Sequence, residues 1–170
     1  TNVISITDGQ IFLESSLFFS GMRPAVNVGL SVSRVGGDAQ TKAMKKASGS
    51  IRIDLAQYRE MEVFTQFSSD LDDATKEQLE YGSGLMELLK QPLGKPMSLA
   101  DKVITLCAAR HKVMLGIPTA KVKGFQMDML SYFASAHPEI AREIEETKDL
   151  SKELSQKIVE IAEEFKKSRC

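Results

Sequence analysis

Two hydrophobic periodicities divide this 170-residue sequence near residue 41. Before that point, the runs TNVISIT, QIFL and NVGLSVS are rich in β-branched or alternating apolar residues, a pattern typical of short strands joined by turns. After it, apolar residues recur every three or four positions, as they do along one side of an α-helix. We therefore predict a strand-and-loop region at residues 1–41 and a helical bundle at residues 42–170.

The helical region is predicted to hold about five or six helices joined by short connections. Ser98 is placed to cap a helix that continues to about Gly116, and Pro138 begins another helix. The stretch SDLDDAT is predicted to be a capped helical turn. The last apolar stripe consists of Leu150, Leu154, Ile158, Ile161 and Phe165.

The strands of residues 1–41 are too few to form a sheet by themselves. A parallel α/β sheet needs several strands with helices packed on both faces. We therefore expect a mainly α chain whose first part is the end of a larger α/β domain, with the earlier strands absent from this chain. Apolar surface left uncovered on the orphaned strands predicts self-association.

Charge and composition exclude several classes of function. The 22 Lys and Arg side chains nearly balance the 23 Asp and Glu side chains, so we expect no nucleic-acid partner. No uninterrupted apolar stretch reaches the ~20 residues that cross a bilayer, and no secretion signal is present, so we expect no membrane insertion. Cys107 and Cys170 are interpreted as free thiols in a reducing compartment.

The residues alone predict neither a metal site nor catalysis by this chain. His111 and His137 lack partners at the spacing of a zinc site. No G-x-x-x-x-G-K-[ST] phosphate loop is present, so the chain lacks the usual means of holding a nucleoside triphosphate with its magnesium ion. Arg34, just before Gly36 and Gly37, is compatible with a structural ion pair, a solvated strand end or a functional cation.

A long segment carries a family resemblance. Residues 5–46, SITDGQIFLESSLFFSGMRPAVNVGLSVSRVGGDAQTKAMKK, and the later stretches LAQYREMEVFTQFSSDLDDAT and ELLKQ resemble the alpha-subunit family of the rotary ATP synthase head. The sister beta subunits have an Asp-Ser-Thr-Ser-Arg pattern where this chain reads LSVSRVGG. The resemblance covers essentially the whole chain. It implies the last strands of a P-loop type nucleotide-binding domain followed by a C-terminal helical domain.

The resemblance implies roles for six residues. Arg34 matches an arginine finger that reaches the terminal phosphate held by a neighbouring beta subunit, and Ser5 matches a supporting position near the same interface. Phe18, Arg23, Pro24 and Gln91 match residues that pack against adenine at a non-catalytic nucleotide site. A second glutamine usual in the family is replaced here by Leu93, which removes one hydrogen-bonding group for the base.

The resemblance also implies ligands and partners. It suggests a regulatory, non-catalytic part in proton-gradient-driven ATP synthesis, with ATP or ADP and magnesium bound in the full-length complex and none held tightly by this chain alone. The implied partners are the beta subunits and the central-stalk gamma subunit. The implied location is a peripheral membrane complex on the cytoplasmic face of the bacterial plasma membrane or its organelle equivalent. The alternative is a stand-alone helical interaction module without nucleotide chemistry.

Overall fold

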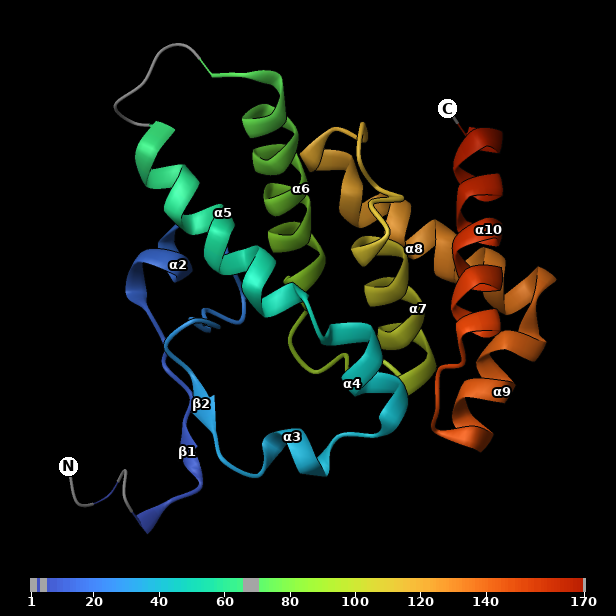
Figure 1. Cartoon of the computed structure of the whole chain (residues 1–170), viewed down its shortest axis with the longest axis horizontal. Coiled ribbons are helices and arrows are strands. Elements are labelled where there is room, and N and C mark those ends of the chain that lie inside the picture. Colours follow the sequence, from blue (N-terminus) through green and yellow to red (C-terminus); the bar gives the residue numbers. More distant parts are fainter. Residues whose placement is uncertain (1–2, 4–5, 66–70, 170) are drawn as a thin grey trace.

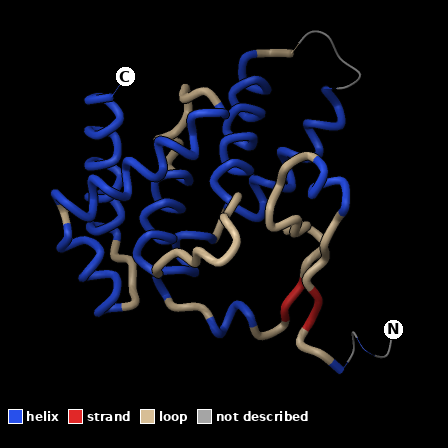
Figure 2. The backbone as a smooth tube through the Cα atoms, turned by 180° about the vertical axis from the view of Figure 1, so that it is seen from behind, coloured by secondary structure: helices blue, strands red, loops and turns tan. Residues whose placement is uncertain are grey.

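Helices make up most of the chain. The computed structural model describes residues 3, 6–65 and 71–169. Among these residues, strand occurs only as one short pair beside the N-terminus, and helices follow one another from there to Arg169 (Figure 1, Figure 2). The predicted mainly α fold is therefore confirmed.

The N-terminal arm, defined here as the described residues before Lys42, lies along one side of the helices (Figure 1). Its elements are β1 (Gly9–Gln10), α2 (Ser15–Phe19), β2 (Val32–Ser33) and α3 (Gly36–Ala39). The two strands are antiparallel, with Gly9 opposite Ser33. An isolated bridge joins Leu13 to Val26 and extends this pairing.

The strands are shorter than the sequence predicts, because side chains close turns inside the runs. In NVGLSVS, Asn27 Oδ1 accepts a hydrogen bond from the Leu30 N–H at 3.0 Å, and the Ser31 hydroxyl donates to the Asn27 carbonyl at 2.6 Å. Such local bonds compete with strand pairing, so the strand begins only at Val32. The predicted strand TNVISIT is wrong in its described part, where Val3 and Ile6 are helical.

The described part of the bundle contains seven helices, more than the five or six predicted. They are α4 (Lys42–Ser48), α5 (Ile51–Thr65), α6 (Asp73–Leu89), α7 (Leu99–Arg110), α8 (Thr119–Ala136), α9 (Pro138–Thr147) and α10 (Lys152–Arg169). The short α4 is separate from α5, with a break at Gly49. This break follows the Ser-Gly pair that weakens the helical pattern in the sequence.

Helix α7 lies at the centre of the bundle. It packs against α4, α8, α9 and α10, and seven of its twelve residues are buried. Its sequence, LADKVITLCAAR, is apolar on nearly all sides, as expected for a helix enclosed by others. The core of the molecule is therefore built around α7.

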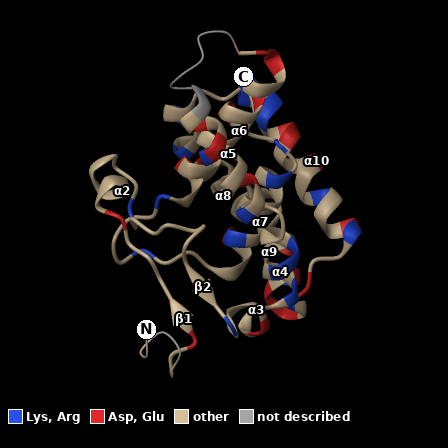
Figure 3. Cartoon of the chain, turned by 60° about the vertical axis from the view of Figure 1, so that its left-hand side comes forward, with Lys and Arg blue, Asp and Glu red and all other residues tan. Residues whose placement is uncertain are grey.

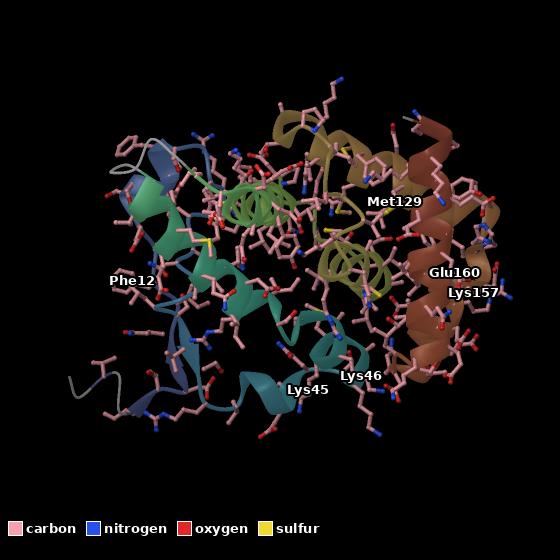
Figure 4. The ribbon with its side chains drawn as sticks, turned by 45° about the horizontal axis from the view of Figure 1, so that its top comes forward. Phe12, Lys45, Lys46, Met129, Lys157 and Glu160 are labelled. Carbon is pink, nitrogen blue, oxygen red and sulfur yellow. The ribbon has the colours of Figure 1, made fainter. Side chains whose placement is uncertain are left out.

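The last helix has one buried side and one exposed side. Every residue of the predicted stripe, Leu150, Leu154, Ile158, Ile161 and Phe165, is buried. Lys157 and Glu160 lie on the exposed side of α10 (Figure 4), where Lys157 forms an ion pair with Glu139 of α9 at 3.4 Å. The helical period of the sequence thus gives the correct inward side.

The helix ends show where local signals succeed and where they fail. Ser98 caps α7 as predicted, accepting a hydrogen bond from the Asp101 N–H at 3.0 Å. The same helix ends at Arg110 rather than near Gly116, because Lys112 adopts a left-handed φ of 58° and the Val113 N–H turns back to the Ala108 carbonyl. Glycine is the usual residue at a left-handed position that ends a helix, so a lysine there does not indicate the helix end in the sequence.

The predicted turn before α6 is confirmed in its described part. Asp72 is the N-cap of α6, and its side chain accepts a hydrogen bond from the Thr75 N–H at 3.1 Å. The hydrogen bonds from Thr75 hold the pKa of Asp72 below its usual range. Residues 69 and 70 of SDLDDAT lie outside the described residues.

Helix α4 is tied to residues far along the chain. The Ala43 N–H donates to the Lys148 carbonyl at 2.9 Å. Lys46 donates to Asp149 Oδ1 at 2.7 Å and to the Leu150 carbonyl at 3.0 Å, and Figure 4 shows it on α4. The connection between α9 and α10 therefore holds the first helix of the bundle in place.

Exposed apolar side chains gather on the N-terminal arm. Ile6 and Phe19 are each 84% exposed, and Ile11 is 76% exposed. The arm carries few charged residues, whereas the bundle helices carry many (Figure 3). Of the helices in the described ranges, none has the length and apolar character needed to cross a membrane.

Candidate functional site

A surface cavity of about 810 Å³ lies where the N-terminal arm meets the loop after α6. Its lining includes all four residues predicted for the adenine site, Phe18, Arg23, Pro24 and Gln91, together with Leu93 and Lys123. Folding thus brings together side chains that lie as far apart as α2 and α8 in the sequence.

The floor of the cavity joins the arm to the bundle. The Arg23 guanidinium lies over the Phe18 ring, with 4.5 Å between its central carbon and the ring centroid. The Gln91 N–H donates to the Arg23 carbonyl at 2.9 Å. Aromatic, guanidinium and amide groups therefore face one space, a combination that suits a flat heteroaromatic ligand.

Side chains on the loop after α6 are oriented by the loop itself. Gln91 Nε2 donates to the Lys95 carbonyl at 2.9 Å, which leaves the oxygen of this amide as the group available for a donor on a ligand. Leu93, which the resemblance matches to a second glutamine, is fully exposed. The cavity therefore offers one side-chain amide from this loop.

Lys123 is a cavity residue that sequence reasoning did not single out. It belongs to α8, and its ammonium donates to the Leu88 carbonyl at 3.3 Å and to the Lys90 carbonyl. Burial lowers the pKa of its amino group, and the nearby Glu87 carboxylate opposes that shift. The basic pattern of AKVKGF gives no sign that this lysine turns inward.

Arg34 lies outside the cavity, directly after β2, and its side chain is exposed. The Asp8 carboxylate accepts hydrogen bonds from the N–H groups of Arg34 at 3.1 Å and Val35 at 2.8 Å. The Ser33 hydroxyl also donates to this carboxylate. Asp8 therefore fixes the backbone from which the Arg34 side chain extends.

The same contacts determine the charge state of Asp8. The hydrogen bond from Ser33, followed by that from the Val35 N–H, holds the pKa of the Asp8 carboxyl below its usual range, and the positive charge of Arg34 acts in the same direction. The carboxylate is therefore ionised at neutral pH. Ser5, the predicted supporting residue, lies outside the described residues.

Among the described residues, the other candidate groups form no second metal or thiol site. In the described part of the chain, no three His, Cys, Asp or Glu side chains are placed to hold a metal ion. Cys107 is a buried free thiol whose sulfur lies 3.2 Å from Ser155 Oγ, and burial raises its pKa. A thiol kept protonated in the core is unreactive. Cys170 lies outside the described residues.

Comparison with known families gives two adjoining matches. Residues 40–165 match the family described as ATP synthase alpha/beta chain, C terminal domain. Residues 1–33 match the ATP synthase alpha/beta family, nucleotide-binding domain.

Several bacterial proteins are similar over nearly the whole chain. The protein named ATP synthase subunit alpha from Clostridium kluyveri is 54% identical over 167 residues, which is 98% of this chain and 33% of that protein. Its namesakes from Acetivibrio thermocellus and Petrotoga mobilis are 55% and 52% identical and are covered to the same 33%. The chain thus spans about a third of the length of these relatives. From the family match and these similarities, the chain belongs to the ATP synthase alpha/beta family and corresponds to a C-terminal portion of its alpha subunits.

Proposed function

We propose that this chain supplies Arg34 as an arginine finger to the catalytic site of a neighbouring beta subunit. The observation that carries the proposal is the placement of Arg34, exposed immediately after β2 on a backbone held by Asp8. A guanidinium mounted on a fixed backbone can meet a partner surface in one orientation, with little ordering of the chain needed on binding.

The chemistry of phosphoryl transfer explains why an arginine suits this position. Negative charge spreads over the equatorial oxygens of the transferred phosphoryl group, and a planar guanidinium can donate to two of them at once. Arginine fingers accelerate such reactions by about 10³ to 10⁵, which corresponds to about 4–7 kcal/mol of barrier lowering. A lysine ammonium is a point charge and does not reproduce the two-pronged geometry.

We further propose that the cavity holds the adenine of a nucleotide at a non-catalytic site. Phe18, Arg23 and Pro24 offer flat faces for the base, and Gln91 offers an amide at its edge. These residues provide no site for the triphosphate or its magnesium ion. That site usually requires a phosphate loop, and the sequence has none. This chain therefore contributes only the base side of the site.

The partners follow from these two roles. Arg34 requires a beta subunit beside it, and the helical domain is proposed to lie near the gamma subunit of a complex attached to the cytoplasmic face of a bacterial membrane or its organelle equivalent. In this proposal ATP synthesis belongs to the assembled complex, with residues 1–41 completing the nucleotide-binding domain and residues 42–170 forming the helical domain.

The arginine-finger proposal is tested by Arg34→Lys in the alpha subunit of an assembled complex. The expected result is a loss of steady-state ATP turnover of about 10³-fold or more, with nucleotide binding by the beta subunits unchanged. Arg142→Lys, an exposed change on α9, is the matched control and should leave turnover intact. Turnover that survives Arg34→Lys would refute the assignment.

A second experiment separates this function from a stand-alone interaction module. The 170-residue chain should bind ATP with magnesium weakly or not at all under either hypothesis. Mixing it with purified beta subunit should give an assembly of fixed stoichiometry only if the chain presents the interface that an alpha subunit uses. Absence of such an assembly in sedimentation favours the independent module.

A further inference from the structure

Lys123 makes contacts that set it apart from Lys121, the other lysine of α8. Its ammonium reaches across to α6, where it donates to the Leu88 carbonyl at 3.3 Å and to the Lys90 carbonyl. The side chain is half-buried, whereas Lys121, two residues earlier on the same helix, is exposed. The ammonium of Lys123 therefore binds carbonyls at the C-terminal end of α6, whereas an exposed lysine would be hydrated by solvent.

The two carbonyls that Lys123 binds belong to the last turn and C-cap of α6. Carbonyls at a helix C-terminus have no partner within the helix and carry partial negative charge. The C-cap Lys90 has an extended conformation, with φ −65° and ψ 130°, so the chain leaves the helix without the left-handed closure that commonly satisfies these groups. Lys123 supplies the missing donor and a matching positive charge.

The residue that follows this helix end is Gln91. Its N–H donates to the Arg23 carbonyl at 2.9 Å, which links the helix end to the arm that carries Phe18. The direction in which the chain leaves α6 therefore determines where the Gln91 amide stands relative to Phe18 and Arg23. Lys123 lines the same cavity and holds the residue immediately before Gln91.

We propose that Lys123 is a positioning residue of the adenine-side cavity: its hydrogen bonds to Leu88 and Lys90 fix the exit from α6 and so place Gln91 against Arg23. This inference rests on the proposed adenine site for its functional meaning. It adds to that site a residue from α8, about 30 residues beyond the loop it controls.

The test uses three variants of the 170-residue chain. Lys123→Met keeps the aliphatic stem and removes the charge and donors, and Lys123→Arg keeps a cation with donors. Lys121→Met makes the same chemical change on the exposed neighbour and serves as the matched control. The readout is amide hydrogen exchange at Gln91, whose N–H bond to the Arg23 carbonyl reports whether the loop stays docked on the arm.

We expect Lys123→Met to accelerate exchange at Gln91 by about tenfold, which converts to about 1.4 kcal/mol of local opening free energy. Lys123→Arg should restore slow exchange, and Lys121→Met should leave it unchanged. Exchange at Ile140 and Ile144, both fully buried on α9, should not respond. Equal exchange at Gln91 in all variants overturns the inference. Acceleration throughout the bundle, or a Lys123→Met chain that fails to fold, also overturns it, because either result points to a global rather than a local role.

A second measurement ties the inference to nucleotide. In the assembled complex, Lys123→Met should lower retention of adenine nucleotide at the non-catalytic site, with rescue by Lys123→Arg. Arg23→Ala and Gln91→Ala test the adenine site itself. If those two variants retain nucleotide normally, the proposed site is wrong, while the exchange result at Gln91 still decides whether Lys123 positions the loop.

Discussion

Glycine 82 is the point at which α5 and α6 approach too closely for any side chain. A Cβ added there would lie 2.5 Å from the Tyr58 Cβ and would overlap the Tyr58 ring carbons. The Cβ of Tyr58 is fixed by the backbone, so no rotamer change can move it away from this contact. Gly82→Ala therefore requires α5 and α6 to separate.

Gly84 provides an internal control on the same helix. A Cβ added at Gly84 meets nothing within 4 Å. Alanine is favoured over glycine inside a helix by about 1 kcal/mol, so Gly84→Ala should raise the free energy of unfolding by about that amount. At Gly82 the same gain is opposed by an overpacking cost of about 3 kcal/mol, the upper end of the usual range. The net expectation for Gly82→Ala is a loss of about 2 kcal/mol.

The two variants should thus shift stability in opposite directions. For a chain of this length, 1 kcal/mol moves the melting temperature by about 2–4 °C. Thermal unfolding followed by circular dichroism should place Gly82→Ala about 4–8 °C below the parent chain and Gly84→Ala about 2–4 °C above it. If Gly82→Ala melts at or above the parent, the close packing of α5 on α6 described here is refuted.

Three further perturbations test other parts of the structure. Gln126 is buried; its Nε2 donates to the Thr105 hydroxyl at 3.2 Å, while its Oε1 has no hydrogen-bond partner among the described residues. The paired change Gln126→Met with Thr105→Val removes both sides of that bond and the unpaired oxygen, so it should raise the free energy of unfolding by about 1 kcal/mol in urea titrations; a decrease would contradict this. Burial and the Glu62 carboxylate raise the pKa of Tyr58 to about 12, and because the folded state holds this proton more tightly, stability should fall as the pH rises from about 10 to about 12. Tyr58→Phe should flatten that dependence, and an identical pH profile for both chains would count against the shift. Exposed apolar groups on the arm predict self-association, so Phe19→Ser should lower the oligomeric fraction in sedimentation velocity, whereas Met127→Ser, which changes an exposed methionine on α8, should not; equal effects would argue against the arm as the contact.

The sequence predicts the buried side of α10 because one periodic stripe determines it. Every residue of that stripe faces the core, since a helix repeats its side chains with a fixed period whatever surrounds it. The strand at NVGLSVS is harder to predict, because Asn27 diverts the backbone into a turn and is itself held by Glu14, 13 residues away. Local pattern cannot reveal a side-chain hydrogen bond that depends on a distant partner.

The candidate site was accessible to sequence reasoning only in part. The family resemblance points to Phe18 and Gln91, whereas periodicity indicates only that such residues are apolar or polar. The contacts of Asp8 with Arg34 span 26 residues, and those of Lys123 with Leu88 span 35. Positioning residues of this kind become visible only when the fold brings their partners together.

The hydrogen bonds between α4 and the connection before α10 impose an order on folding during synthesis. Lys46 finds its partners at Asp149 and Leu150, 103 and 104 residues later. A ribosome must therefore translate these residues, and release them from its exit tunnel, before the first helix of the bundle can be locked. Until then α4 lacks its hydrogen bonds to Asp149 and Leu150. A chaperone that binds nascent chains would meet α4 in this state.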